Sequence, residues 1–199
     1  MPWTRMCGHA LTAGGVLIAA VNAILTPLVP FAEGDAIARS STAYLVRLSL
    51  AEAAALLLLL GCFGAWALPG RATLFRRVAF LVAFAGNAGL VAAEFANLFL
   101  LRPLAQENPE ALAALDASPL YIGGFTAAVS AFGLGWILLA IAALLAPGFD
   151  RRPPGLTLAG LLLTTALTPL GVAGAIVGSL VFGAGLAWFG RAVVARADG

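Results

Sequence analysis

Long apolar stretches with almost no charged residues constrain this sequence more than any other feature. A helix needs about 20 apolar residues to cross the hydrocarbon core of a bilayer, which is about 30 Å thick. Four stretches meet this requirement, and they cover residues 8–31, 43–68, 78–101 and 119–147. Only 10% of the residues are charged, whereas a soluble domain carries about 25%. We therefore predict an all-α, polytopic transmembrane helical bundle that forms a single domain over residues 1–199.

A fifth apolar stretch, residues 154–194, is too long for one span and is interrupted at residues 168–171, Thr-Pro-Leu-Gly. Proline lacks an amide donor and glycine tolerates tight turns, so the chain is expected to reverse there. This predicts a fifth span over 154–168 and a sixth over 171–194. The fifth span rises only about 22 Å as a helix, so we expect a thinned bilayer around it or shielding by its neighbours.

The distribution of arginine predicts the orientation of the chain. All 11 basic residues are arginine, which together with abundant alanine, glycine and leucine indicates a GC-rich bacterial coding bias. Cytoplasmic loops of membrane proteins carry an excess of basic residues. We predict that the chain crosses the inner (cell) membrane of a bacterium six times, with both termini in the cytoplasm. This arrangement places most arginines on the cytoplasmic side. These are Arg5, Arg71, Arg76, Arg77, Arg151, Arg152, Arg191 and Arg196.

The loop before the fourth span carries a helix signal of its own. Asn108 is a preferred N-cap residue, Pro109 suits the first helical position, and Glu110 places an acid in the first turn. We predict a short amphipathic helix over residues 109–116 on the outer surface.

Small residues recur at every fourth position in three predicted spans. Such rows let helices approach closely in a membrane, either within one bundle or between the copies of a homo-oligomer. Both interpretations stay open. The rows are Gly171, Ala175, Ser179, Gly183 and Ala187; Gly123, Ala127, Ala131 and Gly135; and Ala85, Gly89 and Ala93.

Three ionisable residues fall inside predicted spans: Arg47 and Glu52 in the second and Glu94 in the third. A charge at mid-membrane costs roughly 2.5–3.5 kcal/mol, so each is expected to have a partner or a function. At about 1.5 Å per residue, Glu94 lies between Arg47 and Glu52 in depth. This favours an Arg47–Glu94 pair across two antiparallel helices and leaves Glu52 with another partner or with a bound proton.

Asparagines extend the polar pattern. Asn87 and Asn97 share one helix face with Glu94, and Asn22 lies midway along the first span. Two explanations of these residues stay open. They either form interhelical hydrogen bonds worth about 0.6 kcal/mol each, or they line a functional cavity in the outer half of the bundle. Two hydroxyl residues of the fourth span extend the same predicted seam, Thr126 and Ser130.

No metal site, cofactor or nucleic-acid surface is predicted. Cys7, His9 and Cys62 fall toward one face, but a fourth ligand and a known zinc spacing are missing. The arginines are scattered at helix ends and form no stripe for nucleic acid. The expected partners are the lipid bilayer, a small molecule or proton, and further copies of the chain.

Residues 44–48, Tyr-Leu-Val-Arg-Leu, open the second span, and residues 94–98, Glu-Phe-Ala-Asn-Leu, end the third. An Arg-Arg-Pro-Pro-Gly turn at 151–155 leads into the fifth. Together with the helix at 109–116, this order resembles an uncharacterised bacterial family of six-helix membrane proteins, known only as a domain of unknown function. The resemblance covers nearly the whole chain and implies the six-helix fold without an activity.

Three functions fit these observations. The first is a small proton-linked transporter or small-molecule-binding protein that uses Glu52 or Glu94 as a proton-binding carboxylate. The second is a non-enzymatic structural or partner-binding membrane subunit, in which the polar residues set helix register. The third is an intramembrane enzyme on a lipid-like substrate, which the single histidine and the lack of a recognisable catalytic arrangement disfavour.

Overall fold

The apolar stretches fold into long helices in a computed structural model that describes residues 2–66, 68–71 and 73–198. Residues 1, 67, 72 and 199, which belong to the predicted domain and in one case to the predicted second span, lie outside the described residues. The long helices are α1 (Pro2–Ala20), α3 (Thr42–Trp66), α4 (Leu74–Ala96), α7 (Pro119–Leu144) and α9 (Val172–Asp198). The shorter helices are α2 (Asp35–Ser40), α5 (Arg102–Glu107), α6 (Pro109–Asp116) and α8 (Arg152–Ala166).

Two of the long helices continue through irregular turns. After α1 come a π-helical turn η1 (Val21–Leu25) and a 3₁₀ turn η2 (Thr26–Leu28), and after α4 comes a π-helical turn η4 (Asn97–Leu101) that leads into α5. Two further 3₁₀ turns are η3 (Phe31–Glu33) and η5 (Thr168–Leu170).

Five helices in the described part of the chain are long and apolar enough to cross a membrane, which makes this an α-helical membrane protein. With their continuations they cover Pro2–Leu28, Thr42–Gly64, Leu74–Glu107, Pro119–Leu144 and Val172–Asp198. The predicted fifth span corresponds to α8, which has only 15 residues. A helix of that length is shorter than the hydrocarbon core of a bilayer.

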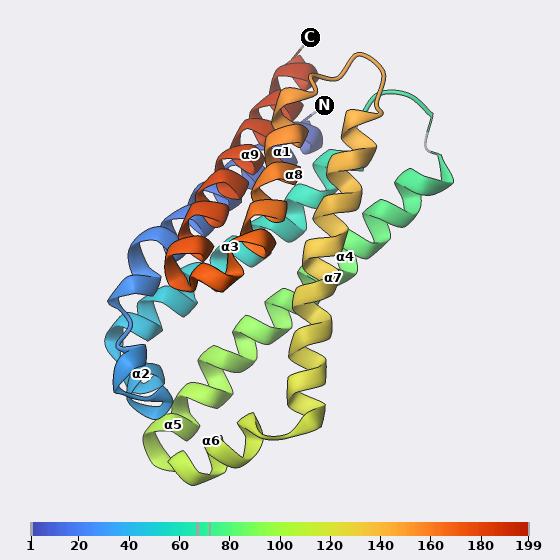
Figure 1. Ribbon diagram of the computed structural model, residues 1–199. Helices are drawn as coiled ribbons and strands as arrows, with labels where there is room; N and C mark the ends of the chain where they lie inside the picture. Colours follow the sequence, from blue (N-terminus) through green and yellow to red (C-terminus); the bar gives the residue numbers. More distant parts are fainter. Residues whose placement is uncertain (1, 67, 72, 199) are drawn as a thin grey trace.

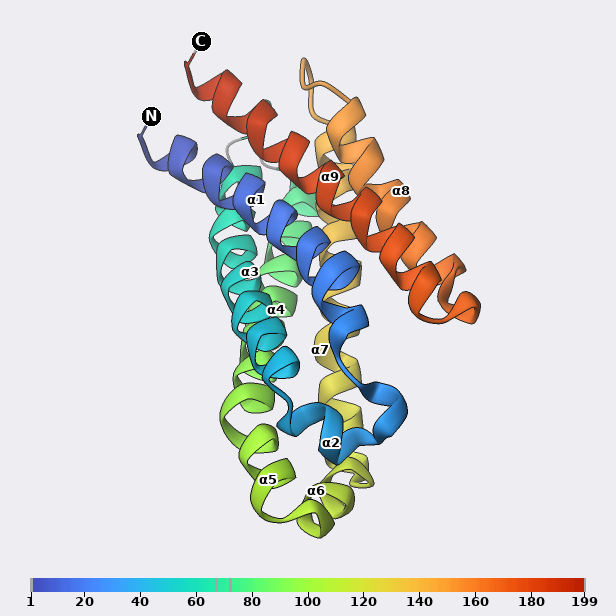
Figure 2. The same ribbon diagram turned by 90° about the vertical axis from the view of Figure 1, so that its left-hand side faces the viewer.

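The two termini lie at the same end of the molecule, and α2, α5 and α6 lie together at the opposite end (Figure 1). We call these the terminal end and the cap end, and we call α2, α5 and α6 the cap. Figure 2 shows α1 and α9 side by side and antiparallel, with α8 against α9. The turn between α8 and α9 lies about halfway along α7, so the hairpin leaves the cap-end half of α7 uncovered (Figure 2).

Glycines allow the closest helix contacts, as the small-residue rows predicted in general terms. A Cβ on Gly15 of α1 would lie 2.6 Å from the carbonyl oxygen of Gly183 of α9. Gly135 of α7 meets Ala83 of α4 in the same way. The predicted row on α9 is divided, because Gly183 packs on α1 whereas Ala175 is exposed.

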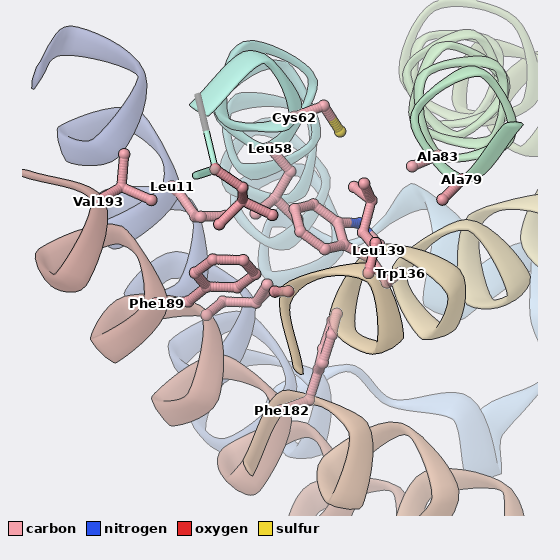
Figure 3. Packing of buried hydrophobic residues seen from close by; sticks show 14 of the residues in the cluster. Leu11, Leu58, Cys62, Ala79, Ala83, Trp136, Leu139, Phe182, Phe189 and Val193 are labelled. Carbon is pink, nitrogen blue, oxygen red and sulfur yellow. The ribbon is translucent and has the colours of Figure 1, made fainter. Parts of the chain in front are cut away.

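The main core lies in the terminal-end half, where side chains of α1, α3, α4, α7 and α9 meet (Figure 3). Trp136 and Leu139 of α7 are almost fully buried there, as are Leu58 of α3 and Phe189 of α9. Phe182 of α9 makes an edge contact with Trp136, with ring centroids 6.4 Å apart. This core fixes α7 against the helices on both of its sides.

The cap has a small core and a polar tie of its own. Leu101, Ala105 and Leu112 are buried together, and Arg39 of α2 forms an ion pair with Asp116 of α6 at 3.1 Å. The Asn108 side chain accepts a hydrogen bond of 3.0 Å from the backbone of Ala111 and so caps α6. This is the short helix for which the sequence carried a cap signal.

Candidate functional site

Arg47 of α3 binds the first span at the cap end. Its Nε donates a hydrogen bond of 3.1 Å to the hydroxyl oxygen of Thr26. The Thr26 hydroxyl in turn donates to the carbonyl oxygen of Val21 at 3.1 Å, across the π-helical turn η1. Among the described residues Arg47 and Glu94 form no salt bridge, so the expected ion pair is wrong, although Glu94 lies within electrostatic range of Arg47.

Glu94 of α4 nevertheless lies at the centre of a polar group. It interacts electrostatically with Arg47 and Glu52, both on α3, and the Asn97 side chain lies within interaction range of its carboxylate. Tyr44 and Tyr121 also lie within electrostatic range of Glu94. We call Arg47, Glu52 and Glu94 the charged cluster; it combines one basic and two acidic side chains.

Each acid of the charged cluster has one buried oxygen without a partner. Oε2 of Glu52 and Oε2 of Glu94 are inaccessible and make no hydrogen bond to any residue in the described part of the chain. Leaving a buried polar atom unpaired costs about 1–3 kcal/mol, and more for a charged group. The cluster also carries one negative charge in excess when both acids are ionised.

Both π-helical turns carry a predicted site residue, Asn22 in η1 and Asn97 in η4. Each turn begins six residues before a proline, Pro27 and Pro103 respectively. A proline within a helix removes one backbone donor and crowds the carbonyl four residues earlier, and a wider π-helical turn relieves that conflict. Sequence reasoning missed these turns, although the two prolines near the ends of apolar stretches were the signal.

The asparagines predicted as one seam lie in different places. Asn97 lies near Glu94, but Asn87 is fully buried in the terminal-end core. The Asn87 amide nitrogen donates to the carbonyl oxygen of Ala83 at 2.6 Å and to the sulfur of Cys62 at 3.2 Å. Its role is therefore to join α4 to α3 within the packed core.

Asn22 belongs to a separate groove between α1, α7, α8 and α9. The groove has a volume of about 530 Å³ and is walled mainly by apolar side chains, Phe132 and Phe182 among them. Its neutral polar lining residues are Asn22, Ser130, Thr164, Thr165 and Ser179. Thr126, predicted beside Ser130, is exposed on α7 and is not one of the lining residues.

The structure brings together four of the six predicted site residues, and these are Arg47, Glu52, Glu94 and Asn97. Thr26 and Tyr44 join them without having been predicted. Among the described residues, no group of three histidine, cysteine or acidic side chains is placed to hold a metal ion. Comparisons with models of known protein families, with curated proteins and with solved structures found no match.

Proposed function

We propose that this protein is a proton-binding membrane transporter whose charged cluster, Arg47, Glu52 and Glu94, takes up and releases the proton. The observation that carries the proposal is the pair of buried, unpartnered carboxylate oxygens on Glu52 and Glu94, where Glu94 lies within electrostatic range of both Glu52 and Arg47. A structural pair needs one acid for one arginine, so the second acid is the feature that a purely structural role leaves unexplained.

Charge balance supports proton binding at this place. With both acids ionised the cluster carries a net charge of −1, and one bound proton makes it neutral. An uncompensated charge in a membrane costs roughly 2.5–3.5 kcal/mol even on the lenient insertion scale. The neutral, protonated cluster can therefore stay out of contact with water while the protein changes the side of the membrane to which the cluster is open. The charged form requires contact with water.

The cap supplies an element that opens and closes over the cluster. It lies at the same end as Arg47 and Glu94 and is tied by the partly exposed ion pair between Arg39 and Asp116. Tyr44 and Tyr121 are within electrostatic range of both Arg39 and Glu94, so they connect the tie to the cluster. Movement of the cap would expose Glu94 to water on that side.

Proton uptake is the direct test because the proton is the one ligand that the proposal names. The protein is reconstituted into liposomes that contain a pH-sensitive dye, and a potassium diffusion potential drives protons inward. We expect dye acidification with the native protein and a loss of at least about tenfold with Glu52→Gln or Glu94→Gln. Glu107→Gln is the matched control, since Glu107 is exposed at the end of α5.

Infrared difference spectra during a pH change provide a second readout that needs no flux. The native protein should show a protonated-carboxyl band that one of the two Gln variants removes. Unaltered acidification together with an unaltered band in both variants contradicts the proposal. Lower thermal stability without any change in proton uptake would instead favour the structural or partner-binding subunit.

We also propose that α8 completes six membrane passages with both termini in the cytoplasm of a bacterial cell. The common end of the two termini and the arginines near that end support this arrangement (Figures 1 and 2). Green fluorescent protein, which fluoresces only when it folds in the cytoplasm, is fused to either terminus, and alkaline phosphatase is inserted at Gly34. Fluorescence at both termini and phosphatase activity at Gly34 are expected, and a dark C-terminal fusion would contradict the six passages.

A further inference from the structure

The groove between α7 and the α8–α9 hairpin opens on the lateral surface of the helix bundle. Val129 and Leu134 of α7, at its edge, are 43% and 52% exposed. The hairpin turns back about halfway along α7, so α8 does not run beside the cap-end half of α7 (Figure 2). Because the lining residues of α7 and α9 belong to helices that are long and apolar enough to cross a membrane, this lateral opening would face lipid.

The lining excludes a charged ligand. The groove combines apolar side chains with hydroxyl and amide groups, and none of the described residues that line it is charged. A ligand charge there would stay unpaired in a low-dielectric environment, at a large free-energy cost. The volume of about 530 Å³ lies within the range of small-molecule sites in proteins.

The hydrogen bonds of the lining residues leave side-chain oxygens free to accept another hydrogen bond. The Asn22 amide nitrogen donates to the carbonyl oxygen of Ile18 at 2.9 Å, and the Thr165 hydroxyl donates to that of Leu161 at 3.2 Å. One of the two amide N–H groups of Asn22 and the hydroxyl proton of Thr165 are therefore engaged within their own helices, while the side-chain oxygens of both residues can still accept. Ser130 and Ser179 form no side-chain hydrogen bond with another described residue.

We propose that this groove is a binding site for a neutral lipid that carries a hydroxyl group, with the chain along α7 and the hydroxyl at the Asn22–Ser130–Thr165 level. The hydroxyl donates its proton to one of these oxygens and accepts from a serine hydroxyl. Such a ligand satisfies polar groups that hydrocarbon tails leave unpaired. The site is distinct from the charged cluster and stands without it.

A filling substitution tests the site without disturbing the fold. Gly133 of α7 lines the groove, and a Cβ built on it meets no atom within 4 Å. The Cβ of Gly133→Leu therefore meets no neighbour, and the rest of the leucine side chain is expected to occupy the groove. Gly123→Leu is the matched control, because Gly123 lies on the same helix, has equal free space and is not among the lining residues.

The experiment uses the full chain in phosphatidylcholine nanodiscs and photolabelling by hexadecanol that carries a diazirine. Labelled peptides are identified by mass spectrometry, and unlabelled hexadecanol competes. We expect labelling within residues 129–134 and 161–165, reduced at least about tenfold by Gly133→Leu and unchanged by Gly123→Leu. Ser130→Ala combined with Thr165→Val removes hydrogen bonds and should weaken labelling about threefold to tenfold.

Two further probes decide what the groove recognises. Diazirine-bearing hexadecane lacks the hydroxyl, and diazirine-bearing palmitate replaces it with a carboxylate. Labelling by hexadecanol several-fold stronger than by either one supports the proposal. Equal labelling by hexadecane would show that ordinary lipid tails fill the groove, and equal labelling by palmitate would contradict a neutral ligand. Equal labelling of the Gly133→Leu and Gly123→Leu variants would overturn the site itself.

Discussion

Nε of Arg47 donates a hydrogen bond of 3.1 Å to the hydroxyl of Thr26, and this contact joins the irregular end of the first span to the second. Thr26 also bonds back to Val21 at 3.1 Å across the π-helical turn η1. One hydroxyl thus satisfies a carbonyl of a distorted turn and a guanidinium of the charged cluster. The distortion and the cluster are parts of the same arrangement.

Thr26→Val is expected to destabilise the protein by about 1–3 kcal/mol, because it removes a hydrogen bond to a charged group and leaves the buried part of Arg47 unpaired. Thermal unfolding in detergent, followed by circular dichroism, measures the loss. Thr126→Val is the control, since Thr126 is exposed and forms no side-chain hydrogen bond with the described residues. Equal stability of the two variants would contradict the role of Thr26.

Arg76→Met is expected to cost about 1–3 kcal/mol, since it removes the hydrogen bonds of a charged, largely buried side chain to backbone carbonyl groups. Arg76 is 7% exposed, and its guanidinium donates to the carbonyl oxygen of Trp66, the last residue of α3, and to those of Pro69 and Gly70 in the loop that follows. Arg77→Met, at an exposed position of the same helix, should stay within about 0.5 kcal/mol of the native protein. Chemical unfolding in mixed micelles compares the stability of the two variants. A similar loss of stability in both would show that the hydrogen bonds of Arg76 do not stabilise the protein.

Gly183→Leu should destabilise the bundle by about 1–3 kcal/mol or more, because α1 and α9 are in direct backbone contact there and overpacking forces them apart. A Cβ added at Gly183 would already lie 2.8 Å from the Cβ of Ala19, before the rest of a leucine side chain is considered. The thermal midpoint in detergent and retention on a sizing column report the change. Gly155→Leu on α8, where a Cβ meets nothing within 4 Å, should leave both unchanged.

A double-mutant cycle on Arg39→Gln and Asp116→Asn should give a coupling free energy of about 0.2–1 kcal/mol, the usual range for partly exposed ion pairs. The side chains of this pair are 17% and 26% exposed. The Arg5–Asp198 pair, at 54% and 49%, should give less coupling and lose it at lower salt. A coupling for Arg39–Asp116 no larger than that for Arg5–Asp198 would show that the ion pair does not hold the cap.

Hydrophobic length indicated the long helices well, because the apolar stretches must bury their backbone polar groups in helical hydrogen bonds. The helix at Pro109–Asp116 follows from Asn108 and Pro109, whose capping chemistry acts within one turn. Depth alone placed Glu94 between Arg47 and Glu52, and Glu94 lies within electrostatic range of both. The depth of a residue in the membrane does not predict the direction of its side chain. The prediction therefore paired Arg47 with Glu94 rather than with Thr26.

Local signals in the chain thus determined that this is a helical membrane protein, where its long helices run, and which charged residues enter them. Only the tertiary structure decided the partner of Arg47, the separation of Asn87 from Glu94, and the groove beside the short α8–α9 hairpin. The physical reason is one of range. Helix formation depends on neighbours one turn away, whereas side-chain partners depend on the rotation of each helix about its axis. Two π-helical turns and the close glycine contacts change that rotation, and the packing of all helices together selects it.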